Sequence, residues 1–393
     1  MPRWPAASRP AGCAMLSRIP RLASTAGRLA LANVTRLSSP LKVNFALTYW
    51  CQYRCKTCNI WKLRPTDELS TDEILAFVAR NAGISWLDVT GGEIFLRKDI
   101  EEVLAAFASW RSLALLHFPT NGFLTDRIVA ACERLARIGG PQVIVTVSVD
   151  GDAALNDDVR GIQGGFDRQM ATLRALRRIA GVRVVVGMTL SPHNMGALER
   201  TFQACQRHCP GLGIADFHVN VAQVSPHYYH NAGLDAVPRQ DAAIRELRLY
   251  RSMRGRPRSV PDWIESSYLH HLESYLRTGE VPMRCHSLRS SCFIDPWGTV
   301  FPCITYSRPV GSLRDHGMSL ASIWESAATA SLQREIWEGN CPRCWTACEA
   351  YQSILGNLVR RAPPQPPHVA EALQPAVAAG SGRASGASGV AES

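Results

Sequence analysis

The amino-acid sequence predicts an α/β fold, with a parallel β-sheet covered by helices and a smaller cysteine-rich region behind it. The first observation is an alternation of β-rich and amphipathic helical runs between residues 41 and 222. The second is that the β-rich runs are almost continuously apolar, which is typical of parallel strands buried on both faces. The third is that nine of the thirteen cysteines form two groups, one after the first expected strand and one after residue 284.

Six β-rich runs are expected to be strands, with helical runs between them. The helical run at 70–82 begins with Ser70 and has Glu73 three positions later, which is the pattern of a capping box. Such a sheet is either doubly wound or curled into a full or partial barrel, and periodicity does not choose between these. The expected strands are 41–50, 84–90, 113–119, 142–150, 182–190 and 214–222, and the expected helices are 70–82, 98–110, 124–139, 166–181 and 195–208.

The rest of the chain divides by composition. Residues 223–284 carry helical patterns and are expected to connect the α/β region, residues 41–222, to the second cysteine group. That group occupies residues 285–350, where turn signals such as DPWG break the chain into short pieces. Residues 361–393 are rich in Pro, Ala, Gly and Ser, which predicts a disordered tail. Residues 1–40 form a basic leader.

The positive charge of the chain is confined to its beginning. The net charge is +10, but no acidic residue occurs before Asp67, and the first 66 residues carry eleven arginines and lysines. The remaining chain has 43 − 11 = 32 basic and 33 acidic side chains, a balance of −1. A nucleic-acid-binding protein would be expected to show a basic face in its folded region. The charge therefore gives no support to nucleic acid as a partner.

Three interpretations of the basic leader stay open. Its composition is that of an organelle transit peptide. It could equally form a helix on an anionic membrane surface, or a plain leader that ends in a helix packed on the folded region. It contains no apolar stretch with a cleavage site, and no apolar run in the chain approaches the ~20 residues of a membrane span. We therefore expect a cytoplasmic protein.

The stretch TYWCQYRCKTCNIW, residues 49–62, places Cys51, Cys55 and Cys58 just after the first expected strand. Ligands gather at the carboxyl ends of the strands in parallel α/β folds. Thiolates ligate zinc or iron–sulfur clusters, and structural zinc needs four ligands. No fourth cysteine or histidine lies nearby, whereas three thiolates leave one iron of a 4Fe–4S cube open. The pattern favours a catalytic iron–sulfur centre, with zinc as the alternative.

The spacing C-x3-C-x2-C resembles the signature of the radical S-adenosylmethionine (SAM) superfamily. The second expected strand ends in TGGE, the third in PTNG, and the fourth in SVDG followed by VRG. These elements, in this order, are similar to recurring motifs of that family. The resemblance implies that Gly91 and Gly92 let the backbone approach the methionine part of SAM and that Glu93 helps receive its amino group. It also implies that Ser148 and Arg160 hold the ribose and carboxylate.

One position departs from the family pattern. Thr57 precedes the third cysteine, where the family usually has an aromatic residue that packs near the adenine. Tyr53 and Trp61 lie close in sequence, so the adenine-packing residue is left unassigned.

The second cysteine group resembles the SPASM and Twitch auxiliary-cluster domains. Cys285, Gly298 and Cys303 follow the opening pattern C-x(9–15)-G-x4-C, and CPRCWTAC resembles the closing cysteines in compressed form. The resemblance implies at least one auxiliary 4Fe–4S cluster, with a zinc-ribbon-like knuckle as the alternative. The candidate ligands are Cys285, Cys292, Cys303, Cys341, Cys344 and Cys348.

Together the resemblances cover about residues 41–350 and imply a partial (β/α)6 TIM-like barrel with a small C-terminal cysteine-rich auxiliary-cluster domain. They imply an enzyme that reductively cleaves SAM to a 5′-deoxyadenosyl radical, which abstracts hydrogen from a substrate. We expect a small biosynthetic substrate that undergoes oxidation, epimerisation or C–C bond formation. Only 40 residues precede the first expected strand, too few for the peptide-clasping domain of many relatives.

Two other functions stay open: a peptide-modifying radical SAM maturase, and a non-enzymatic zinc or iron–sulfur binding module. The expected partner is an electron donor such as flavodoxin or ferredoxin. A lipid substrate, and peripheral membrane contact through residues 1–40, also stay open. The loop SPHYYHN, which contains His227, Tyr228, Tyr229 and His230, follows the last strand and is interpreted as a solvated loop.

Overall fold

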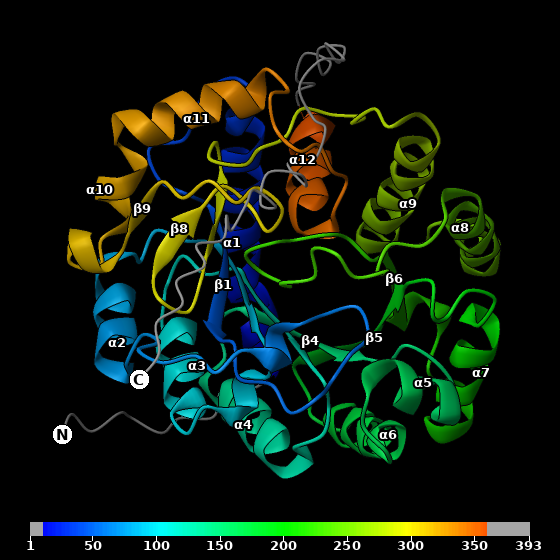
Figure 1. Ribbon diagram of the computed structural model, residues 1–393. Coiled ribbons are helices and arrows are strands. Elements are labelled where there is room, and N and C mark those ends of the chain that lie inside the picture. The colour runs from blue at the N-terminus through cyan, green and yellow to red at the C-terminus, as the bar shows by residue number, and fades with distance from the viewer. Residues whose placement is uncertain (1–10, 360–393) are drawn as a thin grey trace, which may run out of the picture.

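A computed structural model describes residues 11–359 of the chain, and every structural statement below refers to these residues. Its centre is one sheet with the strand order β6-β5-β4-β3-β2-β1-β7-β8-β9. Strands β1 to β6 are all parallel, and each pairs with the next strand in the chain. Figure 1 shows this sheet in the middle of the molecule, with helices α2 to α7 along its outer side. The predicted partial (β/α)6 barrel is confirmed.

All six expected strands and all five expected helices are present, with ends that differ by a few residues. Helix α2 begins with the predicted capping box, in which the Ser70 side chain accepts from the amide of Glu73. The eight-residue helix α5 was not predicted, because it is short and begins at an isolated cap, Asp152. The strands are β1 Lys42–Thr48, β2 Trp86–Gly91, β3 Leu115–Thr120, β4 Gln142–Ser148, β5 Val182–Leu190 and β6 Phe217–Val221. The helices are α2 Thr71–Arg80, α3 Ile100–Ala108, α4 Thr125–Ile138, α5 Ala153–Arg160, α6 Gly165–Leu176 and α7 Leu198–His208.

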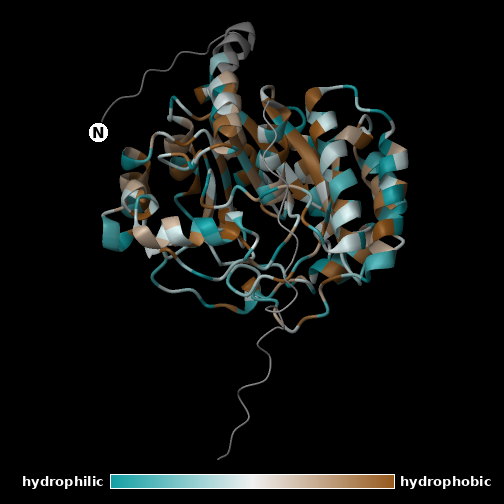
Figure 2. Cartoon of the chain, turned by 90° about the horizontal axis from the view of Figure 1, so that it is seen from above, coloured by the Kyte–Doolittle hydropathy of each residue, from teal (hydrophilic) through white to brown (hydrophobic). Residues whose placement is uncertain are grey.

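The pleat of the strands gives the sheet two unlike faces. The face toward the helices is apolar: the Phe45 ring on β1, for example, meets Phe77 of α2 edge-on at 5.1 Å between ring centroids. Burying such a ring contributes about 1.5–3 kcal/mol. Figure 2 shows the brown, hydrophobic residues concentrated in the central strands and the teal residues on the surrounding helices.

The inner face of the barrel carries polar side chains on most strands, so the expectation of almost continuously apolar strands was wrong at these positions. Two of these polar side chains, His117 and His218, are 29% and 26% exposed, so open space reaches the inner face. Alternating positions on neighbouring strands in register point to the same face. The polar residues at these positions are Lys42, Asn44, Asp88, His117, Thr146 and His218.

Helix α1, Ala11–Ala32, packs on the barrel, as the third interpretation of the leader proposed. Arg21 donates to the carbonyl of Leu113 at 3.0 Å, and Arg28 donates to that of Gly83 at 2.8 Å. Both carbonyls lie in the turns before barrel strands, so these arginines hold α1 against the amino-terminal edge of the sheet. No helix among residues 11–359 is long and apolar enough to span a membrane. Residues 1–10 and the predicted tail 361–393 lie outside the described residues.

The cysteine-rich region joins the barrel through the sheet itself. Strand β7, Ser291–Ile294, pairs in parallel with β1, so that Lys42 is opposite Ser291. The antiparallel strands β8, Thr299–Phe301, and β9, Gly311–Ser312, continue the same sheet. Five further helices accompany this half of the chain: α8 Gln240–Arg254, α9 Val260–Thr278, α10 Leu320–Trp324, α11 Ala327–Trp337 and α12 Ala347–Val359.

Helix α12 covers the open side of the partial barrel, between β1 and α9 (Figure 1). On one side, the Lys42 Nζ of β1 donates to the carbonyl of Cys348 at 2.5 Å. On the other, Tyr351 donates to Glu265 of α9 at 2.6 Å, and Glu265 lies 3.4 Å from His218 of β6. The helix therefore closes the inner space between the first and last barrel strands.

Lys42 is completely buried and forms an ion pair with Asp88 at 3.0 Å. Burial would raise the pKa of Asp88, but the Lys42 charge and a hydrogen bond from His117 hold it well below its usual range. A buried pair of this kind adds little net stability. Removing one partner, however, leaves the other charge unpaired in a medium that cannot solvate it.

We expect Lys42→Met to lower the free energy of unfolding by about 3–5 kcal/mol, because Asp88 loses its counter-charge. The double variant Lys42→Met/Asp88→Asn should recover most of this loss. Anaerobic urea unfolding measures both, with the exposed Lys62→Met as a control that changes stability by less than about 0.5 kcal/mol. Equal stability of Lys42→Met and the parent would contradict the assigned role of the pair.

Candidate active site and auxiliary cysteine pocket

The three-cysteine loop leaves β1 at the carboxyl edge of the sheet and is fixed by backbone hydrogen bonds to α5. The amide of Arg54 donates to the Arg160 carbonyl at 3.1 Å, and the amide of Lys56 donates to the Val159 carbonyl at 2.9 Å. Gly161 has φ +66°, and a Cβ there would lie 2.4 Å from the Arg54 carbonyl oxygen. A glycine is needed at this close approach.

The thiols of Cys51, Cys55 and Cys58 are free and lie close enough to influence one another's ionisation. Burial, with a smaller contribution from the neighbouring Cys55 thiol, raises the pKa of Cys51 to about 12. The pKa of Cys58 is raised by burial and then by Cys55 and Cys51. Three thiols that oppose one another's ionisation are stabilised as thiolates by a shared metal centre, because ligation replaces the protons.

The two glycines of TGGE allow the ends of β1 and β2 to touch. A Cβ on Gly91 would lie 2.2 Å from the Thr48 carbonyl oxygen, and one on Gly92 would lie 2.3 Å from that of Trp50. The amides of Gly92 and Glu93 donate to these same two carbonyls, at 2.8 and 2.9 Å. The glycines are therefore required by the approach of the cysteine loop, a reason that the motif alone did not reveal.

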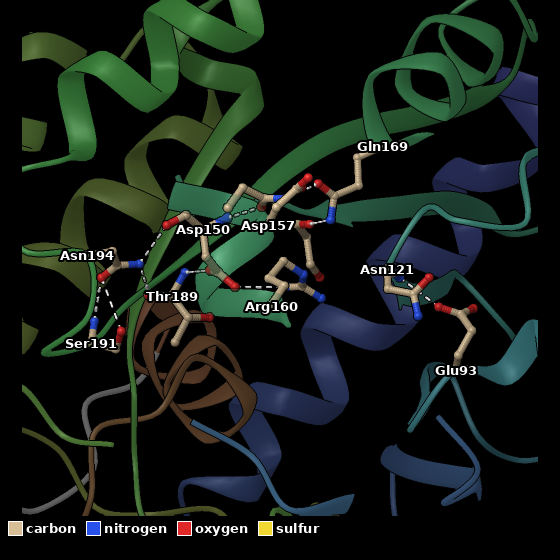
Figure 3. Close-up of polar contacts among 11 residues, drawn as sticks. Glu93, Asn121, Asp150, Asp157, Arg160, Gln169, Thr189, Ser191 and Asn194 are labelled. Atoms are coloured by element: carbon tan, nitrogen blue, oxygen red, sulfur yellow. Dashed lines mark hydrogen bonds and ion pairs between the residues drawn. The ribbon is translucent and has the colours of Figure 1, made fainter. Parts of the chain in front are cut away.

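Glu93 is buried, and its carboxylate is bonded to the end of β3. It accepts from the amide of Asn121 at 2.7 Å and from the hydroxyl of Thr120 at 3.1 Å. Burial raises the pKa of Glu93 to about 7, against the lowering effect of these hydrogen bonds. The motifs TGGE and PTNG are thus joined through this carboxylate, and Figure 3 shows Glu93 directed at Asn121.

Arg160 is buried at the end of α5 and is held by an acidic residue that sequence reasoning missed. Its Nη1 lies 2.6 Å from the Asp150 carboxylate, whose other oxygen accepts from the amide of Thr189 at 2.8 Å (Figure 3). The Nε of Arg160 is buried without a hydrogen-bond partner among the described residues. Ser148 ends β4 two residues before Asp150 and is half-buried. The SVDG motif contained the signal, since Asp150 is its third residue.

The loop SPHYYHN, which we call the His/Tyr loop, connects the two cysteine groups. Its interpretation as a solvated loop was therefore wrong. The Tyr229 carbonyl accepts from the amide of Asn59, at 2.9 Å, in the three-cysteine loop. At the other end, His227 Nε2 lies 3.1 Å from the Cys303 carbonyl. Between them, buried Tyr228 shares a 2.6 Å hydrogen bond with Thr90, the residue before Gly91. The loop contacts both regions.

Four cysteines of the second group line one pocket, together with Thr305 and Tyr306. Burial, then the nearby carboxylate of Glu349 and the neighbouring thiols of the other three, raise the pKa of Cys285 well above its usual value. A 4Fe–4S cluster takes four cysteine thiolates, and this pocket supplies four. No three His, Cys, Asp or Glu side chains among residues 11–359 converge as tightly as a single metal ion requires. The four cysteines that line the pocket are Cys285, Cys303, Cys341 and Cys344.

The structure does not bring the other two candidate ligands to this pocket. Cys292 lies on β7 and is buried in the apolar core. Cys348 is the second residue of α12 and lies close to Lys42 and Asp88 on the inner side of the barrel. The sequence could not separate these two from Cys341 and Cys344, because the spacing of the cysteines does not show which of them converge.

Comparison with protein-family models matches residues 45–205 to the radical SAM superfamily and residues 285–345 to the SPASM iron–sulfur cluster-binding domain. The chain belongs to the radical SAM superfamily. The two matches cover the barrel from within β1 to within α7, including the three-cysteine loop, and most of the cysteine-rich region. With both domains present, this radical SAM protein is a 4Fe–4S, SAM-dependent enzyme that also carries an iron–sulfur auxiliary domain.

Among curated proteins, the chain is 28% identical over 336 residues to the AdoMet-dependent heme synthase of Methanosarcina barkeri, covering 79% of this chain and 90% of the relative. It is 25% identical to the sporulation killing factor maturation protein SkfB of Bacillus subtilis, covering 77% and 69%. Among solved structures, SuiB of Streptococcus suis bound to S-adenosylmethionine superposes with a TM-score of 0.55 at 14% identity, covering 76% of this chain and 68% of SuiB. The solved structure supports the fold of this radical SAM enzyme.

We predict that the six C-terminal cysteines separate into two classes by iron content. Alanine at Cys285, Cys303 or Cys344 should reduce the iron of the reconstituted enzyme from about eight to about four atoms per chain, because one four-iron cluster loses a ligand. Cys292→Ala and Cys348→Ala should keep about eight. Iron and sulfide analysis with EPR of the reduced enzyme measures this. A loss of iron in Cys348→Ala equal to that in Cys344→Ala would contradict the four-cysteine assignment.

Proposed function

We propose that this radical SAM enzyme abstracts hydrogen from a small biosynthetic substrate held against the polar inner face of the barrel. The observation that carries the proposal is the convergence of three free thiols, Glu93 and Arg160 at the carboxyl edge of the sheet, above that inner face. When bound, the three-cysteine cluster and SAM supply a 5′-deoxyadenosyl radical. The chain itself binds and orients the reactants and excludes water.

Cys51, Cys55 and Cys58 are proposed to ligate the SAM-binding cluster, and the four cysteines of the pocket are proposed to ligate one auxiliary cluster. For SAM, the unpartnered Nε of Arg160 is a buried donor that lacks an acceptor. An unsatisfied donor of this kind costs about 1–3 kcal/mol, which a carboxylate or ribose oxygen would offset. The half-buried hydroxyl of Ser148 is proposed to bind the ribose.

Gly91 and Gly92 are proposed to support SAM binding indirectly, because they let the cysteine loop approach β2. Glu93 already accepts three hydrogen bonds from the chain. Any bond to the SAM amino group is therefore proposed to use its remaining lone pairs, while the end of β3 fixes the carboxylate in place.

A small substrate is supported by the inner face, where partly exposed His117 is held by Asp88 at 3.1 Å and lies 2.9 Å from the Thr146 hydroxyl. Helix α12 covers the side through which a bulky substrate would reach these groups. The similarity to a heme synthase over most of both chains is in line with this substrate class. A cytoplasmic location is part of this proposal.

Peptide maturation is the second candidate function. It is favoured by the similarity to SkfB, which is named as a maturation protein, over 77% of this chain. A peptide segment would have to enter beside α12, so its backbone would be expected to contact the His/Tyr loop.

The decisive test is the formation of 5′-deoxyadenosine by the anaerobically reconstituted enzyme with SAM and dithionite. We expect product from the parent chain and none from Cys51→Ala, Cys55→Ala or Cys58→Ala. The Cys292→Ala variant is the matched control, since it removes a buried thiol outside both sites. A parent enzyme with full iron content and no 5′-deoxyadenosine would refute the proposal.

Asp150→Asn should weaken SAM binding about 10- to 100-fold, because Arg160 loses the ion pair that orients it. Equilibrium dialysis of SAM against the reconstituted variant measures this, and iron content should stay unchanged. Asp158→Asn, which removes only the exposed partner of Lys56, is the control and should bind SAM as the parent does. Parental SAM affinity in Asp150→Asn would contradict the role of the Asp150–Arg160 pair.

A further inference from the structure

The outer surface of the three-cysteine loop carries two tryptophans among basic side chains. We call it the basic loop surface, and it consists of Trp50, Arg54, Trp61, Lys62 and Arg64. Trp50 is 44% exposed and directly precedes Cys51, whereas Trp61 is half-buried and donates to the Cys58 carbonyl at 2.9 Å. Leaving a large apolar ring in water is unfavourable, so an exposed tryptophan beside a redox site points to a partner.

Cationic side chains flank both rings. The Arg54 guanidinium and the Lys62 Nζ lie 5.9 and 5.2 Å from the Trp61 ring centre, and the Arg64 guanidinium lies 6.0 Å from that of Trp50. These contacts hold the long side chains against the rings without neutralising them. Aromatic and arginine side chains of this kind are enriched at protein–protein interfaces.

The surface keeps a net positive charge, because one nearby acid is paired with an arginine and the other is bonded to the end of β1. Asp67 forms an ion pair with Arg314 at 2.7 Å, and Glu68 accepts from the amide of Tyr49 at 2.6 Å. Within residues 11–359, the exposed side chains of Arg54, Lys62 and Arg64 form no ion pair. Two of the four lysines of the whole chain, Lys56 and Lys62, lie on this loop.

We propose that the basic loop surface is the docking site of an acidic one-electron carrier protein of the flavodoxin type. This rests on the proposed function, in which the three-cysteine centre must be reduced before each cleavage of SAM. One electron leaves the reduced carrier and enters that centre, so the carrier is oxidised by one electron and no bond forms or breaks. Electron transfer slows steeply with distance, and a partner seated on Trp50 and Trp61 contacts the loop that holds the thiols.

Charge complementarity favours such a carrier, because transient electron-transfer complexes have small interfaces and depend on electrostatic steering. Basic residues with interleaved aromatic rings also suit single-stranded nucleic acid. A transient encounter with a carrier needs only a small surface of this kind, whereas a single strand needs a basic groove that follows its backbone.

The test compares two reductants in the same assay of 5′-deoxyadenosine formation. Reduced flavodoxin must dock, whereas dithionite reaches the centre by diffusion. In the double variant Lys62→Glu/Arg64→Glu, the flavodoxin-supported rate should fall about tenfold or more, and the dithionite-supported rate should stay within about twofold of the parent. Trp50→Ala should act in the same direction, and the flavodoxin-supported parent rate should fall with added salt.

Matched controls use equally exposed residues elsewhere. Arg137→Glu on α4, Arg245→Glu on α8 and Trp263→Ala on α9 should leave both rates unchanged. Unchanged flavodoxin-supported rates in the loop variants would overturn the proposal. Equal losses with both reductants would overturn it too, because they would assign these side chains to the structure of the loop.

Two further measurements keep this inference separate from the proposed function. Calorimetric binding of oxidised flavodoxin to the reconstituted enzyme needs no SAM cleavage, and it should weaken about tenfold in Lys62→Glu/Arg64→Glu. A parent that makes no 5′-deoxyadenosine with dithionite refutes the proposed function and leaves this binding result standing. Binding of a single-stranded oligonucleotide that the same variant abolishes, with flavodoxin binding unchanged, would overturn the proposal in favour of nucleic acid.

Discussion

The structure depends on the double pairing of β1. This strand is fully buried, pairs in parallel with β2 on one side and β7 on the other, and carries both the ion pair of Lys42 and the three-cysteine loop. Because β7 comes from the cysteine-rich region, one strand fixes the positions of both cysteine groups. A shift of β1 by one residue would move its apolar side chains to the inner face and its polar ones into the core.

The chain couples its two cysteine sites a second time, through the His/Tyr loop. Tyr229 bonds to the loop of Cys58, and His227 bonds to the backbone of Cys303. Stacking of His227 on Phe301, with ring centroids 4.4 Å apart, fixes the second contact. Because this loop leaves the last barrel strand, the geometry of both sites depends on the completed barrel.

Burial governs the chemistry of both cysteine sites. The thiols lie where water solvates a thiolate poorly, so burial raises the pKa of every cysteine in the two sites. Ligation by iron must stabilise the thiolates in place of water. Loading of the clusters is therefore coupled to the release of protons and to the stability of the fold. The proposed electron carrier would meet this buried chemistry only through the charged outer side of the loop.

The sequence by itself determined the six barrel strands with five of their helices, the parallel sheet and the two cysteine groups, because hydrophobic period, caps and motif spacing are local signals. It also indicated Arg160, since the motif that contains it is continuous in the chain. Only the tertiary structure decided which four of six cysteines share a pocket, and that Asp150 holds Arg160. It also decided that α12 closes the barrel and that the glycines of TGGE serve the approach of β1. The physical reason is that these contacts join residues far apart in the chain, and their partners are chosen by packing and by the pairing of buried charges rather than by spacing.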